Sequence, residues 1–412
     1  MQEPRPVVRF AQDERYPPRR DALHVFTEQT GIDVSLDLLP ADRLARLARH
    51  AFGARPDWDL LVLDEVIVAE QIHRGLLEPL GRRAHRDGMD LDDFPQAAID
   101  RFRASDVIYA IPFAAKSNVL IYRPDILERY DLSVPGTFDE LRAIALAAQE
   151  VLQRDGIVDV AGLASCGRGG YGENFSILGS TLFPSWGWSW SRGSGQPPRV
   201  NEPATVDALA FYAALLREAG PPAAARMTAA DARRYFAKGK AVFLLAPATE
   251  LAALRREDPE GTGSTAASAL VPIGPSGRPE PGLSAPALCI PASSPVKDEA
   301  WELLRFLLSP EELRKDAIEL GMPETPRQSV FDSDVYAAAY DEAYRATLAE
   351  TRRYARINRP LIPFGFDLGD ITAAAAEAAI AGEQTADVAL HNAQDVIDGM
   401  HWSLTPGQNR PA

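Results

Sequence analysis

Acidic residues that follow predicted strands are the side chains best suited to chemistry in this chain. Carboxylates accept hydrogen bonds from hydroxyl groups and pair with amines, and α/β sheets bind ligands beyond the carboxyl ends of their strands. The acids in such loops are Asp13, Glu14, Asp64, Glu65, Glu173 and Glu250. The cations there are Lys116 and Arg168. This excess of acids favours a hydroxyl-rich or amine-bearing solute over a phosphate or a carboxylate.

Asp64 and Glu65 also have a structural interpretation. An aspartate directly before a helix can act as its N-cap, and a glutamate in the first turn interacts favourably with the helix dipole. The two interpretations are compatible, because an N-cap carboxylate can also face a binding site.

Three tryptophans lie within five residues, at Trp186, Trp188 and Trp190. Large indole rings are costly to leave in water and need either a core or a ligand. One interpretation is that an indole face stacks on the apolar C–H face of a sugar ring. The other is that the three rings form a packed corner beneath a loop. Both remain open, and we expect at least one ring to touch a ligand.

Motifs for covalent or metal chemistry are missing. The chain contains no G-x-S-x-G, H-E-x-x-H or C-x-x-C, and its six histidines are scattered. We therefore expect no catalytic residue, no metal site and no cofactor. A glycosidase-type carboxylate pair, which one sequence cannot reveal, and a nucleophilic Cys166 in the glycine-rich segment 163–172 are the enzymatic alternatives. Cys166 and Cys289 could form a disulfide, but we favour two buried thiols.

Bulk properties limit the class of protein. A length of 412 residues predicts two or more domains. The formal net charge of −15 argues against nucleic acid and against an anionic membrane surface as partners. No apolar run is long enough for a transmembrane helix. The first residues are polar and proline-rich rather than a signal peptide, so either a leader is missing from this chain or the protein stays in the cytoplasm.

The N-terminal third alternates strand and helix. Strands are predicted at residues 7–11, 33–39 and 58–63, with helices between and after them. The last of these strands is almost wholly apolar, as expected for a parallel strand covered on both faces. This βαβαβ order predicts a doubly wound parallel sheet, which positions the acids at 13–14 and 64–65 on one edge.

The chain is organised around residues 109–152. Strands are predicted at 107–112 and 118–122, and a long helix begins after Thr137. Thr137 and Glu140 have the spacing of a capping box, in which each side chain binds the backbone N–H of the other residue. A second amphipathic helix is predicted at 297–308, followed by Ser309 as the N-cap of another helix.

These segments resemble the carbohydrate-binding solute-binding proteins of bacterial ABC importers, the extracellular family 1 that includes the maltose-binding proteins. The family's Y-x-x-P crossing, its L-x-Y-N-K-D strand and turn, and its P-x-T-W-D-E-L helix start correspond to residues 109–112, 120–125 and 135–141. Residues 300–311, A-W-E-L-L-R-F-L-L-S-P-E, match a closing motif of the family. Two tryptophans of the family pattern are absent here, where Ala248 and Pro286 stand instead.

The resemblance implies a two-lobed periplasmic-binding-protein-like fold of type II. Each lobe is expected to be a doubly wound α/β sheet with flanking helices, and a hinge of several crossings joins them. The expected lobes are residues 1–112 with 285–322, and residues 113–284 with 323–412. Asp64 is implied to line the cleft. Further ligand-binding candidates complete the set: Phe113, Asn118, Tyr171, Asn174 and Phe366.

The implied function is capture of a small polar solute, a mono- or oligosaccharide or a polyol, and its delivery to an ABC permease by hinge closure. Alternatives are an enzyme on the same scaffold acting on a glycoside or amine, a binding protein for an amino sugar or polyamine, and a receptor that only senses. We expect a monomer outside the cytoplasm, either periplasmic or lipid-anchored at the outer face of the cell membrane.

Overall fold

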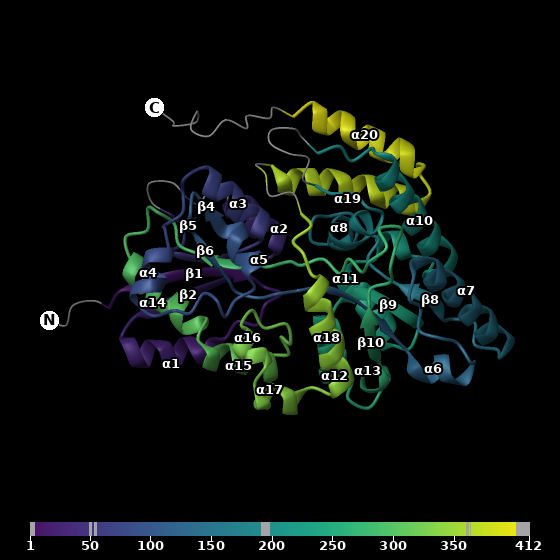
Figure 1. Ribbon diagram of the computed structural model, residues 1–412, viewed down its shortest axis with the longest axis horizontal. Helices are drawn as coiled ribbons and strands as arrows, with labels where there is room; N and C mark the ends of the chain where they lie inside the picture. Colours follow the sequence, from purple (N-terminus) through teal and green to yellow (C-terminus); the bar gives the residue numbers. More distant parts are fainter. Residues whose placement is uncertain are drawn as a thin grey trace.

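Two separate sheets organise the molecule (Figure 1). The computed structural model describes residues 5–48, 52, 56–190, 198–359, 362 and 364–400. We call the part built on the sheet with strand order β2-β1-β3-β11-β6 the first lobe. The part built on the sheet with order β10-β7-β9-β8 is the second lobe. In the view of Figure 1 the first lobe lies on the left and the second on the right.

The first sheet confirms the predicted βαβαβ order. Its strands are β1 (Val7–Asp13), β2 (Asp33–Leu39), β3 (Leu60–Leu63), β6 (Ala110–Pro112) and β11 (Ala287–Cys289). Strand β1 is parallel to β2 and β3, whereas β11 is antiparallel to β3 and β6. All four residues of β3 are buried, as its uninterrupted apolar sequence predicts.

Helices cover this sheet on both sides. They are α1 (Arg20–Thr30), α2 (Ala41–Ala48), α3 (Glu65–His73), α4 (Gly81–Arg86), α5 (Gln96–Ile99), α14 (Lys297–Leu307) and α15 (Pro310–Ile318). Trp301 and Leu304 of α14 pack in one core cluster with Phe10 and Phe26. The amphipathic pattern predicted at 297–308 therefore faces the sheet. Ser309 accepts a hydrogen bond from the Glu312 N–H and caps α15.

The strand predicted at 107–112 is divided in the structure. Strand β5 (Val107–Ile108) pairs with β4 (Arg103–Ala104) in a small sheet, whereas β6 pairs with β11 in the first sheet. The single run of apolar residues did not reveal that its two halves have different partners, because partner choice is a long-range property.

The second sheet is mixed rather than doubly wound throughout. It contains β7 (Asn118–Tyr122), β8 (Ala161–Ala164), β9 (Ala241–Pro247) and β10 (Ala267–Leu270). Strand β7 is antiparallel to both β9 and β10, and only β8 and β9 are parallel. Strand β7 follows the crossing from the first lobe, and β10 pairs with it on the side away from β9.

Helices of the second lobe surround that sheet. They are α6 (Pro124–Arg129), α7 (Phe138–Arg154), α8 (Asn174–Ile177), α9 (Phe183–Ser185), α10 (Pro203–Ala219), α11 (Ala229–Ala237), α12 (Thr249–Glu257), α13 (Thr262–Thr265), α18 (Glu342–Tyr354), α19 (Gly365–Ala381) and α20 (Ala386–Asp398). Helix α7 carries the predicted capping box of Thr137 and Glu140. No described helix is both long and apolar enough to cross a membrane.

Two crossing segments run side by side between the lobes. The Lys116 N–H donates to the Ser284 carbonyl at 2.9 Å, and the Ser284 N–H donates back at 2.8 Å. A third segment joins them where the Ala115 N–H donates to the Glu324 carbonyl. Beyond it, α16 (Gln328–Phe331) and α17 (Asp334–Ala339) lie against α15 of the first lobe.

Candidate functional site

Loops from both lobes meet at the carboxyl ends of their central strands. The first lobe contributes the loops after β1 and β3, and the second contributes the loops after β8 and β9. The crossing segment at Lys116 closes one side. We call this set of residues the interlobe site: Asp13, Arg15, Tyr16, Asp64, Glu65, Lys116, Tyr171, Glu250, Glu324 and Arg359.

Asp64 connects the two lobes. It is the N-cap of α3, where its Oδ1 accepts the Val66 N–H at 3.0 Å. The same oxygen accepts the Tyr171 hydroxyl of the second lobe at 2.8 Å. Its Oδ2 accepts Arg359 Nη1 at 2.9 Å. The N-cap interpretation of Asp64 is therefore confirmed, and the carboxylate also faces the other lobe.

Glu65 is fully buried beside Asp64. Its Oε2 accepts hydrogen bonds from the Ser284 hydroxyl at 3.3 Å and from the Ala285 N–H at 3.2 Å, both on a crossing segment. Burial and then the charge of Asp64 raise the pKa of this carboxyl to about 7, while Arg359 opposes the rise. Glu65 thus links the first lobe to the hinge and is partly protonated at neutral pH.

The loop after β1 presents a cation, and the carboxylate of Asp13 in it is not free. Both oxygens of Asp13 are occupied by Arg15, through its N–H at 2.9 Å and its Nε at 2.8 Å. The Arg15 guanidinium extends to the second lobe, where a Cβ added at Gly172 would lie 3.2 Å from Nη1. Glycine at position 172 therefore allows the two lobes to approach closely. Glu14 is exposed in the same loop.

Lys116 lies where the crossing segment meets this loop. Its Nζ is 4.1 Å from the ring centroid of Tyr16, a cation–π contact. Burial and then the nearby charge of Arg15 lower the pKa of Lys116 to about 8. Asp13, Glu250 and Glu324 act in the opposite direction. The ammonium makes no hydrogen bond or ion pair with any residue that the structure describes.

The remaining acids of the site are held by the protein. Glu250, at the start of α12, pairs with Arg233 at 3.1 Å, and burial raises its pKa. Glu324 on the third crossing accepts the Ser117 N–H at 3.0 Å, and burial raises its pKa to about 7. Glu173 accepts the Ala229 N–H at 2.8 Å, so it fastens the glycine-rich loop to α11.

Aromatic rings form one wall of the second lobe behind Asp64. The ring centroids of Tyr171 and Phe366 are 4.7 Å apart, and those of Tyr171 and Phe175 are 5.4 Å apart. The Arg359 guanidinium carbon lies 5.0 Å from the Tyr171 centroid. Tyr171 and Phe366, two of the candidates named from the sequence, are therefore in contact, and the ring of Tyr171 is already flanked by protein groups.

The tryptophans lie apart from the interlobe site, and their contacts do not favour the expectation that one of them touches a ligand. Trp188 is buried, donates its Nε1–H to the Arg199 carbonyl at 3.1 Å and packs against Trp190. Trp186 packs between Phe138 and Phe211. All of these rings share the core of the second lobe with its helices. The packed corner is the interpretation that the structure supports.

Three other candidates also serve the fold rather than the site surface. Asn118 donates to the Ser176 carbonyl and to the Thr181 hydroxyl inside the second lobe. Asn174 donates to the Gly167 and Ala373 carbonyls, and so ties the glycine-rich loop to α19. Phe113 is fully buried against Tyr16. Their side chains are consumed by internal contacts, so we no longer place them among the ligand contacts.

Both cysteines are free and buried, as favoured from the sequence. Cys166 donates its thiol to Glu173 at 3.2 Å. Burial, and then the charge of Glu173, raise the pKa of this thiol well above its ordinary value, which disfavours the nucleophilic thiolate. Among the described residues no three histidine, cysteine, aspartate or glutamate side chains gather in a metal-binding group.

Sequence reasoning missed several residues of the site. Arg15 and Tyr16 follow Glu14 directly, so extending that loop by two residues would have found them. Glu324 lies on the third crossing, close to the lobe boundary expected between residues 322 and 323. Arg359 gave no local signal, because the structure alone brings it to Asp64, 295 residues away in sequence.

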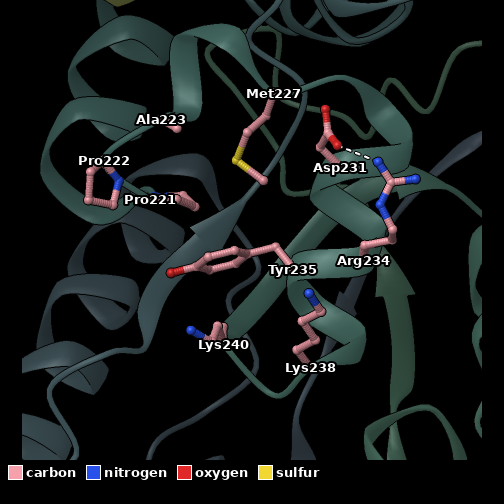
Figure 2. A pocket seen from close by; sticks show the side chains of 9 residues that line it. All are labelled: Pro221, Pro222, Ala223, Met227, Asp231, Arg234, Tyr235, Lys238 and Lys240. Atoms are coloured by element: carbon pink, nitrogen blue, oxygen red, sulfur yellow. Dashed lines mark hydrogen bonds and ion pairs between the residues drawn. The ribbon is translucent and has the colours of Figure 1, made fainter.

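A separate hollow of about 380 Å³ lies on the second lobe (Figure 2). It runs between the loop before α11 and the end of that helix. Its lining is Pro221, Pro222, Ala223, Met227, Asp231, Arg234, Tyr235, Lys238 and Lys240. Arg234 pairs with Asp231 across one rim, and Lys240 pairs with Asp159. Its cations are thus mostly neutralised, and the hollow has no contact with the interlobe site residues.

Comparisons with known proteins agree with this architecture. Residues 9–313 match the family described as bacterial extracellular solute-binding protein. The mannitol-binding protein of Pseudomonas aeruginosa is 26% identical over 355 residues, which cover 82% of this chain and 79% of that protein.

Two solved structures show the same fold. A ribitol complex of an ABC transporter solute binding protein from Agrobacterium radiobacter has a TM-score of 0.85 at 22% identity, covering 95% of this chain and 98% of that chain. Maltose-bound MalE3 of T. maritima has a TM-score of 0.83 at 23% identity, with coverage of 95% and 99%. The two-lobed α/β fold expected from the sequence is confirmed.

Proposed function

This chain belongs to the family of bacterial extracellular solute-binding proteins, and on that premise we propose that it captures a small sugar or polyol for an ABC importer. Its family is one of binding proteins, and its description places the protein outside the cytoplasm. A mannitol-binding protein is among the relatives, and ribitol and maltose are the bound solutes of two structural neighbours.

One observation carries the proposal. Asp64 of the first lobe binds both Tyr171 and Arg359, which belong to the other side of the interlobe site. Polar groups from both lobes therefore converge at the carboxyl ends of the strands, where α/β folds bind ligands. A solute that touches both sides favours the closed arrangement by its differential affinity for it.

The residues that we propose as solute contacts are some of the ligand-binding candidates named from the sequence. They line the interlobe site from both lobes and the crossing segment: Asp13, Glu14, Asp64, Glu65, Lys116, Tyr171, Glu250 and Phe366. Glu173 supports this set by fixing the glycine-rich loop. Because protein groups already flank Tyr171, we propose a monosaccharide or acyclic polyol rather than an oligosaccharide that needs long stacking platforms.

The lobes that we propose to move together have nearly the boundaries expected from the sequence. We propose crossings after residues 112 and 284. We propose that the third crossing extends from Glu324 to the start of α18 and so ends later than expected, because Val330 still packs in the core of the first lobe and Arg327 still pairs with Asp93. We also propose that the protein acts as a monomer, leaves its solute chemically unchanged and is periplasmic or lipid-anchored.

A binding screen tests the proposal. Thermal unfolding is measured with sugars, polyols, amino sugars and polyamines, and a hit at ~100 times its Kd stabilises the fold by ~2.7 kcal/mol. Chromatography of the recovered solute checks that it is unchanged. Loss of cellular uptake of that solute on deletion of the gene tests the link to the permease. Stabilisation by no sugar or polyol, or uptake that survives the deletion, would contradict the proposal.

A further inference from the structure

The carboxylates of the interlobe site have protein partners, whereas one of its cations has none. Asp13 is held by Arg15 and Asp64 by Tyr171 and Arg359. Glu65 accepts the Ala285 N–H and Glu324 accepts the Ser117 N–H, both from crossing segments. Glu250 pairs with Arg233, and Glu173 accepts an N–H of α11. Counting these acids as free acceptors, as the sequence suggested, therefore overstates the affinity of the site for an amine.

Lys116 is the exception. Its ammonium lies over the Tyr16 ring, which satisfies none of its three N–H donors by a conventional hydrogen bond. Within the described ranges it has no carboxylate partner closer than the ion-pair limit of 4.0 Å, although Asp13, Glu250 and Glu324 all influence it. Part of the residue's surface is exposed, and no described residue uses these donors.

Arg15 adds a second set of donors on the same side. Its Nε and Nη2 bind Asp13, whereas Nη1 points toward Gly172 of the second lobe and makes no hydrogen bond with the described residues. The positive charge of Arg15 also acts to lower the pKa of Lys116. Two cations with donors that no described residue uses are therefore neighbours, one on the loop after β1 and one on the crossing segment.

We propose that the solute is a carboxylated sugar or polyol, such as an aldonate or a uronate, whose carboxylate binds between Lys116 and Arg15. The inference rests on the proposed function and specifies its substrate class. The hydroxyl groups of such a solute match the polar groups around Asp64 and Glu250, because a hydroxyl both donates and accepts. The carboxylate supplies the acceptors that Lys116 lacks.

A single negative charge fits this site better than a phosphate dianion. Among the three described cations of the interlobe site, Lys116 alone lacks a carboxylate partner, and the carboxylates of Asp13, Glu250 and Glu324 influence it. The second negative charge of a phosphate would be repelled by these carboxylates, and the described site has no second unpaired cation to compensate for it. A protonated amine, in turn, would be repelled by Lys116 and Arg15 while finding the carboxylates already bonded.

Calorimetric titration at pH 7 with matched solute pairs tests the inference. The pairs are gluconate against sorbitol and glucuronate against glucose, with glucosamine and glucose 6-phosphate as further arms. We expect the acid to bind about ten- to hundredfold more tightly than its neutral partner in at least one pair, as for a charge-assisted hydrogen bond. Lys116→Gln should remove that difference, whereas Lys238→Gln at the separate hollow should preserve it.

The outcomes separate this inference from the proposed function. If neutral polyols bind as tightly as their acids, or if glucosamine or glucose 6-phosphate binds best, the carboxylate inference is wrong and the binding function stands. If no sugar, polyol or sugar acid binds at all, the proposed function fails and the inference fails with it. Arg15→Gln gives a second test if Lys116→Gln does not fold, because it should also reduce the preference for the acid.

Discussion

The Tyr171 hydroxyl of the second lobe donates a 2.8 Å hydrogen bond to Asp64 of the first lobe. Asp64 is fixed in place as the N-cap of α3, and Tyr171 is fixed by ring contacts with Phe175 and Phe366. Because the two residues are anchored in different lobes, this bond forms only when the lobes are together. It is therefore a direct indicator of the closed state.

Removing the hydroxyl should favour the open state. Tyr171→Phe preserves the ring packing but deletes one hydrogen bond to a charged acceptor, a contribution of ~1.5–3 kcal/mol. We expect the solute-free variant to have a larger radius of gyration than the unsubstituted protein, measured by small-angle X-ray scattering. Solute affinity should fall because closure now costs more.

Tyr130→Phe is the matched control. The Tyr130 hydroxyl also donates to an aspartate, Asp155, at 2.6 Å, but both residues belong to the second lobe and the bond is exposed. This substitution should change neither the radius of gyration nor the affinity. If both variants scatter alike, the Tyr171 bond has no part in closure.

The tryptophan cluster should control stability rather than binding. Trp188→Ala deletes a buried ring with a satisfied indole N–H, so we expect a loss of ~3–5 kcal/mol in the free energy of unfolding. Trp186→Ala should cost less because Trp186 is only partly buried. Denaturant unfolding and calorimetric titration check the pair. A large loss of affinity in a variant that keeps its stability would restore the idea of sugar stacking.

Glu65 should make stability depend on pH. Its pKa rises from 4.5 to about 7 on folding, so between these values the native state binds a proton that the unfolded state has lost. At low pH the protonated Glu65 contributes up to ~3 kcal/mol to the free energy of unfolding, and this contribution is lost as the pH rises through 7. Glu65→Gln lacks this loss, so its stability relative to the unsubstituted protein should improve from pH 5 to pH 8.

Denaturant unfolding of both proteins at several pH values measures this difference. Other carboxyls with raised pKa values, such as Glu324 and Asp316, occur in both proteins and cancel in the comparison. Parallel pH profiles would mean that Glu65 ionises normally in the folded protein.

Binding of a sugar acid should weaken in alkaline solution. The pKa of Lys116 is lowered to about 8, so its ammonium is charged at pH 7 and is lost as pH rises through 8. Once the amine is neutral, the Kd for gluconate should increase about tenfold per pH unit until neutral binding is reached.

The neighbouring titratable groups define the control for this measurement. Asp13, Arg15 and Tyr16 face Lys116 from the loop after β1, Glu250 from α12 and Glu324 from the third crossing. Deprotonation of Glu324 near pH 7 also weakens anion binding, and this effect persists in Lys116→Gln. An equally steep rise of Kd in that variant would show that Lys116 is not the titrating group.

Local pattern was sufficient to predict much of the framework. The alternating residues of β2 and the reciprocal capping of Thr137 and Glu140 depend on neighbours within a few positions, and both occur as predicted. The position of Asp64 after a buried apolar strand also follows from order along the chain. These features are short-range, so the sequence alone determines them.

The partners of the polar groups were decided by tertiary structure. Nothing near Arg359 in the sequence indicates Asp64, and nothing near Trp188 distinguishes a core from a binding platform. Likewise, Asp13 and Lys116 both count as candidate ligand groups in the sequence, but only the fold shows that Asp13 is bonded to Arg15 and that Lys116 lacks a carboxylate partner. The sequence determines which charges the chain carries and the edges of the sheets where they gather. Which of them remain available to a solute depends on contacts between segments far apart in the chain, and these form only when the lobes fold and meet.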